Sequence, residues 1–183
     1  MRRKNTTSKT MKQYMAEALL ILMKDKDFHE ISIGALTKKA GVHRSTYYRN
    51  FQSKEEILRF YFQQIIELQR EKIPSNQLEF KEYMLQMFTH YYQYKEHLLL
   101  IYRANLSYLM LDVFNHVFQS AHGGDTPKDS YFTYYHTGGI YNNFILWFSN
   151  NMQETPEEIT AIICSFFPQN FQPMLTTLKS KKF

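Results

Sequence analysis

The sequence predicts an all-α protein of about nine helices. Apolar residues recur at helical spacing along the chain, and no segment shows the strict apolar-polar alternation of a half-buried strand. With 183 residues, the chain can bury a core without disulfides or metals. Its one cysteine, Cys164, cannot form an intramolecular disulfide, so a reducing compartment, the cytoplasm, is expected. No apolar run is long enough to cross a membrane.

The first predicted helix covers residues 8–24, because apolar side chains repeat at helical spacing there without proline or glycine. A short helix follows from Ser32, a good N-cap, to Ala40. Gly41 ends it, because glycine readily adopts the left-handed conformation that a sharp turn needs. A second short helix is predicted over residues 43–50, with an exposed face that is basic and rich in hydrogen-bonding groups.

The next predicted helix is long, spans about residues 53–72, and ends before Pro74. Ser53 and Glu56 have the spacing of a capping box at its start. Ser75 or Asn76 is expected to cap the helix after it, which carries Phe80. Further helices are predicted over residues 98–102, 106–118, 131–150 and 156–167, with a glycine-rich loop over 121–127. Thr155, Pro156 and Glu158 form a strong start for the last helix.

The net charge of +5 is unevenly distributed. Residues 1–72 hold 15 Lys and Arg against 8 Asp and Glu, whereas residues 73–183 hold 7 against 9. A positive excess confined to the front of a chain indicates a polyanionic partner for that part.

The two short helices joined by Ala40, Gly41 and Val42 have the geometry of a helix-turn-helix, whose second helix enters the DNA major groove. The segment 31–58, with its A-G-V turn, T-Y-Y-R-x-F helix and S-K-E-E cap in fixed register, resembles the tetracycline-repressor (TetR) family. The resemblance implies a helix-turn-helix DNA-binding domain over residues 1–52 and a helical ligand-binding and dimerisation domain over 53–183. The long helix at 53–72 would connect them.

Chemistry and resemblance together give a set of candidate DNA-binding residues. Arg44 and Arg49 can each donate a bidentate pair to guanine or clamp a phosphate. The family usually has a small capping residue at the position of His43 and glycine at that of Ser45, so here both side chains are expected to contact DNA. The remaining candidates are Ser32, Thr46, Tyr48, Asn50 and Lys54, of which Ser32, Tyr48, Asn50 and Lys54 match positions that usually contact the DNA backbone.

Two further points concern this basic region. Arg2, Arg3 and Lys4 are expected to follow a groove as a flexible arm. The alternative is that the basic residues form only a solvated surface, as most runs of charge do.

The part of the chain after Pro74 is unusually aromatic, which favours a ligand pocket, although aromatic residues at helical spacing are often simply core. The candidate pocket residues are Phe88, Tyr91, Tyr102, His116, Tyr134, Tyr135 and Tyr141. The polar groups that such a pocket can use include His90, His97 and His136. No metal site or cofactor is expected, because His90 and His97 alone are a weak metal pattern.

The last two predicted helices resemble those that dimerise in many TetR proteins. Gly138 and Gly139 lie inside a helix, where each costs about 1 kcal/mol against alanine, and the close approach of a neighbouring helix is one compensation. A dimer with two-fold symmetry would match a palindromic operator.

The resemblance implies a ligand-responsive transcription regulator, with a repressor expected, that a small-molecule effector releases from its operator. The alternative is a co-regulator of the same fold that acts through protein contacts without an operator of its own. An enzyme is not expected, because Cys164 has no nearby base and no phosphate-binding loop or carboxylate pair appears.

Overall fold

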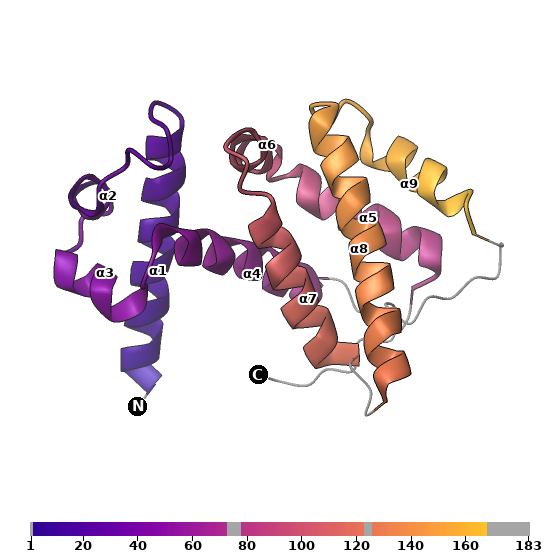
Figure 1. The fold of residues 1–183 in the computed structure, drawn as a ribbon, viewed down its shortest axis with the longest axis horizontal. Coiled ribbons are helices and arrows are strands. Elements are labelled where there is room, and N and C mark those ends of the chain that lie inside the picture. The colour runs from indigo at the N-terminus through magenta and orange to yellow at the C-terminus, as the bar shows by residue number, and fades with distance from the viewer. Residues whose placement is uncertain (1, 73–77, 123–125, 168–183) are drawn as a thin grey trace.

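The computed structural model describes residues 2–72, 78–122 and 126–167. Over these ranges the chain forms nine helices and no strand, which confirms the predicted all-α class. The helices of residues 2–50 stand at one side of the molecule, a long helix over residues 54–72 runs away from them, and the helices of residues 80–164 form a larger body at the other side (Figure 1). None of the helices in the described ranges has both the length and the apolar content that a bilayer crossing requires.

The smaller unit consists of α1 (Arg2–Met23), α2 (Ile33–Lys39) and α3 (Arg44–Asn50). Helix α1 packs against both short helices. Leu19, Leu36 and Tyr47 are almost completely buried where the three helices meet. The apolar spacing of α1 therefore provides the surface on which the two short helices are held.

The ends of α2 follow the predicted chemistry. The Ser32 hydroxyl accepts a hydrogen bond from the Ala35 backbone N–H at 3.1 Å, and Gly41 has a φ of +66°. His43 precedes α3 without capping it through its side chain, as expected for a poor cap. The expected flexible arm is wrong, because Arg2, Arg3 and Lys4 belong to the first turn of α1.

Helix α4 (Lys54–Lys72) links the two parts of the molecule, since it packs against α1 on one side and against α5 and α7 on the other. The Ser53 hydroxyl accepts a hydrogen bond from the Glu56 N–H at 3.3 Å, as the capping box predicts. The Glu56 carboxylate, however, accepts a hydrogen bond at 2.8 Å from the backbone N–H of Gln52, and not from that of Ser53. The second half of the box is thus displaced by one residue.

The larger body contains five helices: α5 (Phe80–Tyr92), α6 (Lys95–Arg103), α7 (Tyr108–His122), α8 (Pro127–Ser149) and α9 (Pro156–Cys164). Helix α8 packs chiefly on α7, and α9 packs on α5. Phe88, Phe114, Phe144 and Trp147 are fully buried between these helices, and the Trp147 indole N–H donates to the Glu154 carbonyl at 3.0 Å. A cluster of aromatic side chains therefore lies at the centre of this body.

Several helix limits differ from the predicted ones. Helix α5 begins at Phe80, after Glu79, and the expected caps Ser75 and Asn76 lie outside the described residues. Helix α8 begins at Pro127 rather than 131, because the Thr126 hydroxyl caps it by accepting from the Asp129 N–H. Helix α9 has the full predicted capping box but ends at Cys164.

Candidate functional site

Helix α3 presents a polar, basic face to solvent. Tyr47 is only 2% exposed and lies 6.4 Å from Phe51, ring centre to ring centre, so these two residues fix the inner side of the helix. On the outer side, Tyr48 is 67% exposed. His43, Arg44, Ser45 and Arg49 are also exposed, and Thr46 is half-buried. These six predicted residues thus lie along α3 and at its N-cap, and five of them are exposed to solvent.

The side chain of Arg44 lies back over α2. A methyl group built on Gly34 would collide with Nη2 of Arg44 and lie 3.3 Å from its Cζ. The absence of a side chain at Gly34 therefore makes room for the guanidinium. No local sequence pattern indicates this contact, because it depends on how α2 and α3 cross.

Asn50 is engaged within the protein. Its side-chain N–H donates to the Thr46 carbonyl at 2.7 Å, and its oxygen accepts from the Ser8 hydroxyl at 2.8 Å. These bonds tie the end of α3 to α1. Asn50 is therefore placed to orient α3, while its predicted contact with DNA stays a prediction.

Lys54 has a structural role that the sequence did not suggest. Its ammonium group donates to the carbonyls of Phe28, Ile31 at 2.8 Å and His29 at 3.3 Å, and it lies 4.6 Å from the centre of the Phe28 ring. Burial lowers the pKa of Lys54, although Glu55 and Asp27 act in the opposite direction. Lys54 thus fastens the segment between α1 and α2 to the start of α4, and little of its hydrogen-bonding capacity is left for a phosphate.

The candidate pocket residues do not form one site. Phe88 and Tyr91 are core residues, and the Tyr91 ring lies 4.7 Å from that of Phe144. Tyr102 packs on Phe148, His116 is exposed, and Tyr141 is half-buried. A crevice beside Tyr91 measures only about 10 Å³, which is too small for an organic ligand.

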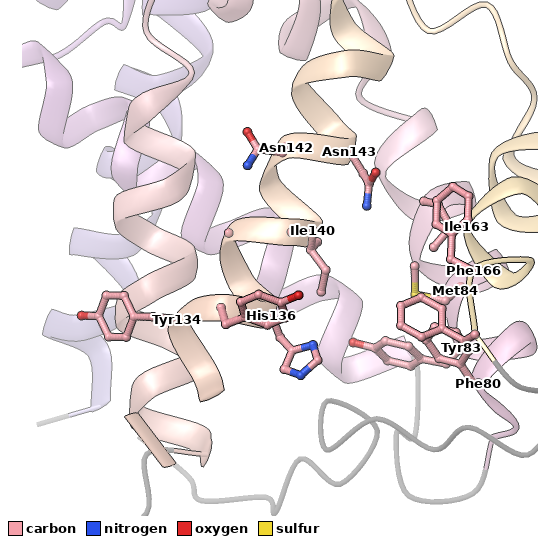
Figure 2. Close-up of a pocket in the computed structure, with 14 residues that line it drawn as sticks. Phe80, Tyr83, Met84, Tyr134, His136, Ile140, Asn142, Asn143, Ile163 and Phe166 are labelled. Carbon is pink, nitrogen blue, oxygen red and sulfur yellow. The ribbon is translucent and has the colours of Figure 1, made fainter. Parts of the chain in front are cut away.

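A larger cavity of about 620 Å³ lies between α5, α8 and α9, and two of the predicted residues, Tyr134 and Tyr135, are among its lining residues. His136, Ile140 and Asn143 extend from α8 toward α5 and α9 in Figure 2, whereas Tyr134 and Asn142 point to the other side of α8. The facing walls consist of residues from the two other helices and the segment after α9: Phe80, Tyr83, Met84, Ile163, Phe166 and Phe167. The sequence missed these six because the cavity arises where α8 diverges from its neighbours.

Helix α8 also has an outward stripe of mostly apolar residues, which we define as Tyr131, Tyr135, Gly139, Asn142 and Leu146. These residues recur every three or four positions and are all exposed, with Tyr131 at 80% and Leu146 at 62%. A Cβ atom built on Gly139 would meet nothing within 4 Å. The outward side of α9 adds Ile162 and Phe166, which are also exposed.

The two histidines that were considered for metal binding have other partners. His90 donates from Nε2 to the Ile65 carbonyl at 2.8 Å, and Nδ1 of His97 lies 2.7 Å from the Tyr61 hydroxyl oxygen. Among the residues that the structure describes, no group of three metal-ligating side chains occurs.

A helix-turn-helix with an exposed basic second helix, joined through a long helix to a larger helical body, defines a class of DNA-binding transcription regulators. Residues 17–59 match the family model described as bacterial regulatory proteins, tetR family. The predicted resemblance is confirmed over these residues, so the N-terminal part of the chain is similar to the tetR-family regulatory proteins.

The whole chain is also similar to a solved structure, described as the dihydroxyacetone kinase operon activator DhaS. The TM-score is 0.56 at 17% identity, and the similarity covers 92% of this chain and 96% of the other. At this identity the likeness shows a common fold. Among curated protein sequences, none matches this chain.

Proposed function

We propose that this regulator binds a palindromic operator as a homodimer and responds to a small-molecule effector. The observation that carries the proposal is the outer face of α3, where Arg44 and Arg49 are exposed while Tyr47 and Phe51 anchor the helix from below. Arginine side chains on such a helix can reach guanine in the major groove or clamp phosphates beside it. Action on DNA would place the protein in the cytoplasm.

Dimerisation is proposed through the last two helices, α8 and α9. The outward stripe on α8, together with Ile162 and Phe166 of α9, is the kind of apolar surface that soluble monomers rarely leave uncovered. Gly139 leaves open space in the middle of the stripe, so a helix from a second copy can approach closely. A two-fold dimer would hold two α3 helices about 34–36 Å apart, one turn of DNA.

The position of α4 between the two parts of the molecule suggests a separate role for each part. We propose that residues 1–52 bind DNA and that residues 53–183 bind the effector and dimerise. Since α4 contacts α1 as well as α5 and α7, a shift of the larger body on effector binding would change the spacing of the two α3 helices. The effector would then release a repressor from its operator.

Activation is a second candidate, because the structurally similar DhaS is described as an operon activator. A reporter gene placed behind the selected operator separates the two. Loss of the regulator raises expression if it represses and lowers expression if it activates.

The DNA-binding proposal is tested by selecting bound sites from a random DNA library and measuring their affinity over a range of salt concentrations. A symmetric site and an affinity that falls steeply with salt are expected. Arg49→Ala should weaken binding by about 1–3 kcal/mol if Arg49 reads a base, whereas the control Arg103→Ala, on α6, should not. Absence of DNA binding by the folded protein would favour the co-regulator alternative.

The dimer is tested by light scattering of Leu146→Glu, which puts a charge into the stripe. The variant is expected to be monomeric. Tyr108→Glu is the matched control, because Tyr108 is also exposed but lies on α7. A wild-type protein that is monomeric at high concentration would contradict the proposed interface.

A further inference from the structure

The cavity between α5, α8 and α9 has the dimensions of a ligand site. Its volume of about 620 Å³ falls within the usual range of about 300–1,000 Å³ for small-molecule pockets. The surrounding interior is, by contrast, closely packed: the Phe88 ring lies 5.4 Å from those of both Phe144 and Trp147. The space is thus confined to the region where α8 separates from the other two helices (Figure 2).

The chemistry of the walls selects for an uncharged molecule. None of the lining residues that the structure describes is Lys, Arg, Asp or Glu. Because a charge buried without a partner is strongly disfavoured, an ionic ligand would gain nothing here to offset its lost hydration. The apolar surface comes from Met84, Ile140 and Ile163 and from phenylalanine rings.

A few polar groups lie among these apolar walls. Asn143 and His136 extend from α8 into the space, and Tyr83 lines it from α5 (Figure 2). Burial raises the pKa of Tyr83 to about 12 and lowers that of His136, so both side chains are uncharged at neutral pH. His136 and Asn143 can offer hydrogen bonds that orient a ligand without attracting a charge, whereas Tyr83 already has a hydrogen bond with the side chain of Gln69.

We propose that this cavity is the small-molecule site of the regulator and that it binds a neutral, largely apolar compound carrying one or two hydrogen-bonding groups. The assignment rests on the proposed function, since it locates the effector site of that regulator. Tyr135, Gly139 and Asn142 belong both to the cavity lining and to the outward stripe. A ligand in the cavity therefore adjoins the proposed dimer interface, and α8 connects it through α7 to α4.

The site can be tested with a pair of fluorescent probes that share one aromatic skeleton. N-phenylnaphthylamine is neutral, and anilinonaphthalene sulfonate carries a negative charge. Full-length protein is titrated with each. The neutral probe should bind saturably, with one molecule per chain, and at least about tenfold more tightly than the sulfonate, because only the sulfonate brings an unpaired charge.

Substitutions locate the binding. Ile140→Trp fills the cavity and should weaken the neutral probe by about tenfold or more, and Asn143→Trp serves as a second filling variant at a more polar position. Ile145→Trp is the matched control, since Ile145 is a half-buried isoleucine of α8 outside the cavity lining. Circular dichroism confirms that each variant is folded.

Three results would overturn the assignment: no saturable binding of the neutral probe, equal binding by the folded filling variants and wild type, or preference for the sulfonate. Binding to random DNA is measured on the same preparations. Retained DNA binding without probe binding would reject the cavity and leave the proposed function standing. A different result is that the wild type binds the probe, loses that binding in Ile140→Trp, and fails to bind DNA. That result would support the cavity as a ligand site and reject the proposed function as a DNA-binding regulator.

Discussion

Replacing Gly34 by alanine would separate DNA binding from stability. The new methyl group would collide with the Arg44 guanidinium, which lies at the end of a long side chain and can move away at little cost. Alanine also stabilises a helix relative to glycine by up to about 1 kcal/mol. Gly34→Ala is therefore expected to leave the free energy of unfolding unchanged or to raise it slightly.

DNA binding should respond in the opposite direction. If Arg44 reads a base from its position over Gly34, its displacement removes a contact worth about 1–3 kcal/mol, which corresponds to about a 5- to 150-fold loss of affinity. If the displaced guanidinium finds another base, the preferred operator sequence changes as well. Both effects arise without any alteration of the residues that face DNA.

The assay combines chemical denaturation with gel shifts on the selected operator and on variants of it. Gly41→Ala is the control for the substitution itself: its methyl would meet no atom within 4 Å, but the φ of +66° disfavours alanine, so this variant should lose about 1 kcal/mol of stability. If Gly34→Ala binds the operator with wild-type affinity and sequence preference, the position of Arg44 over α2 has no part in recognition.

Three further predictions concern the half-buried Lys54 and the buried His90 and Thr137. Lys54→Met should lower the free energy of unfolding by about 1.5–3 kcal/mol in denaturation experiments, because it removes charge-assisted hydrogen bonds to several backbone carbonyls. An unchanged free energy of unfolding would refute the structural role of Lys54. Burial lowers the pKa of His90 below 6.5, so the folded state favours its neutral form. The free energy of unfolding should therefore be highest above pH 6.5 and fall at lower pH, and it should fall less steeply in His90→Gln. An equal dependence on pH in the variant and the wild type would contradict this. Thr137→Val should raise the melting temperature or leave it unchanged, because the buried Thr137 hydroxyl has no hydrogen-bond partner in the described structure. A large fall in the melting temperature would show that the hydroxyl does have a partner.

The helix-turn-helix, with α3 as its proposed DNA-contacting helix, was largely predictable from the sequence. Its limits, the cap at Ser32 and the left-handed Gly41 depend on neighbours within a few residues, and the pattern of exposed and buried side chains follows from helical spacing. Lys54 was assigned only a DNA contact, because its three carbonyl partners lie more than twenty positions earlier in the chain. No local pattern indicates such a contact.

For the larger body, the sequence predicted the helical architecture but not the position of the cavity. The sequence suggested a pocket among aromatic residues, and it included Tyr134 and Tyr135, which line the cavity. Phe88 and Tyr91 share the same helical spacing but are close-packed. Periodicity tells which side of a helix is apolar, and only the angle at which two helices diverge tells whether that side is filled.

The amino-acid sequence by itself determined the all-α class, the helix-turn-helix and its basic face, and the start of the last helix at the Thr155 capping box. These features depend on backbone capping, side-chain spacing and charge, which act over short distances along the chain. The tertiary structure alone decided that Arg44 lies over Gly34, that Lys54 holds the segment before α2, and that α8 leaves a cavity beside α5 and α9. Each of these depends on helices distant in sequence meeting at a particular angle, which is set by the packing of the whole core.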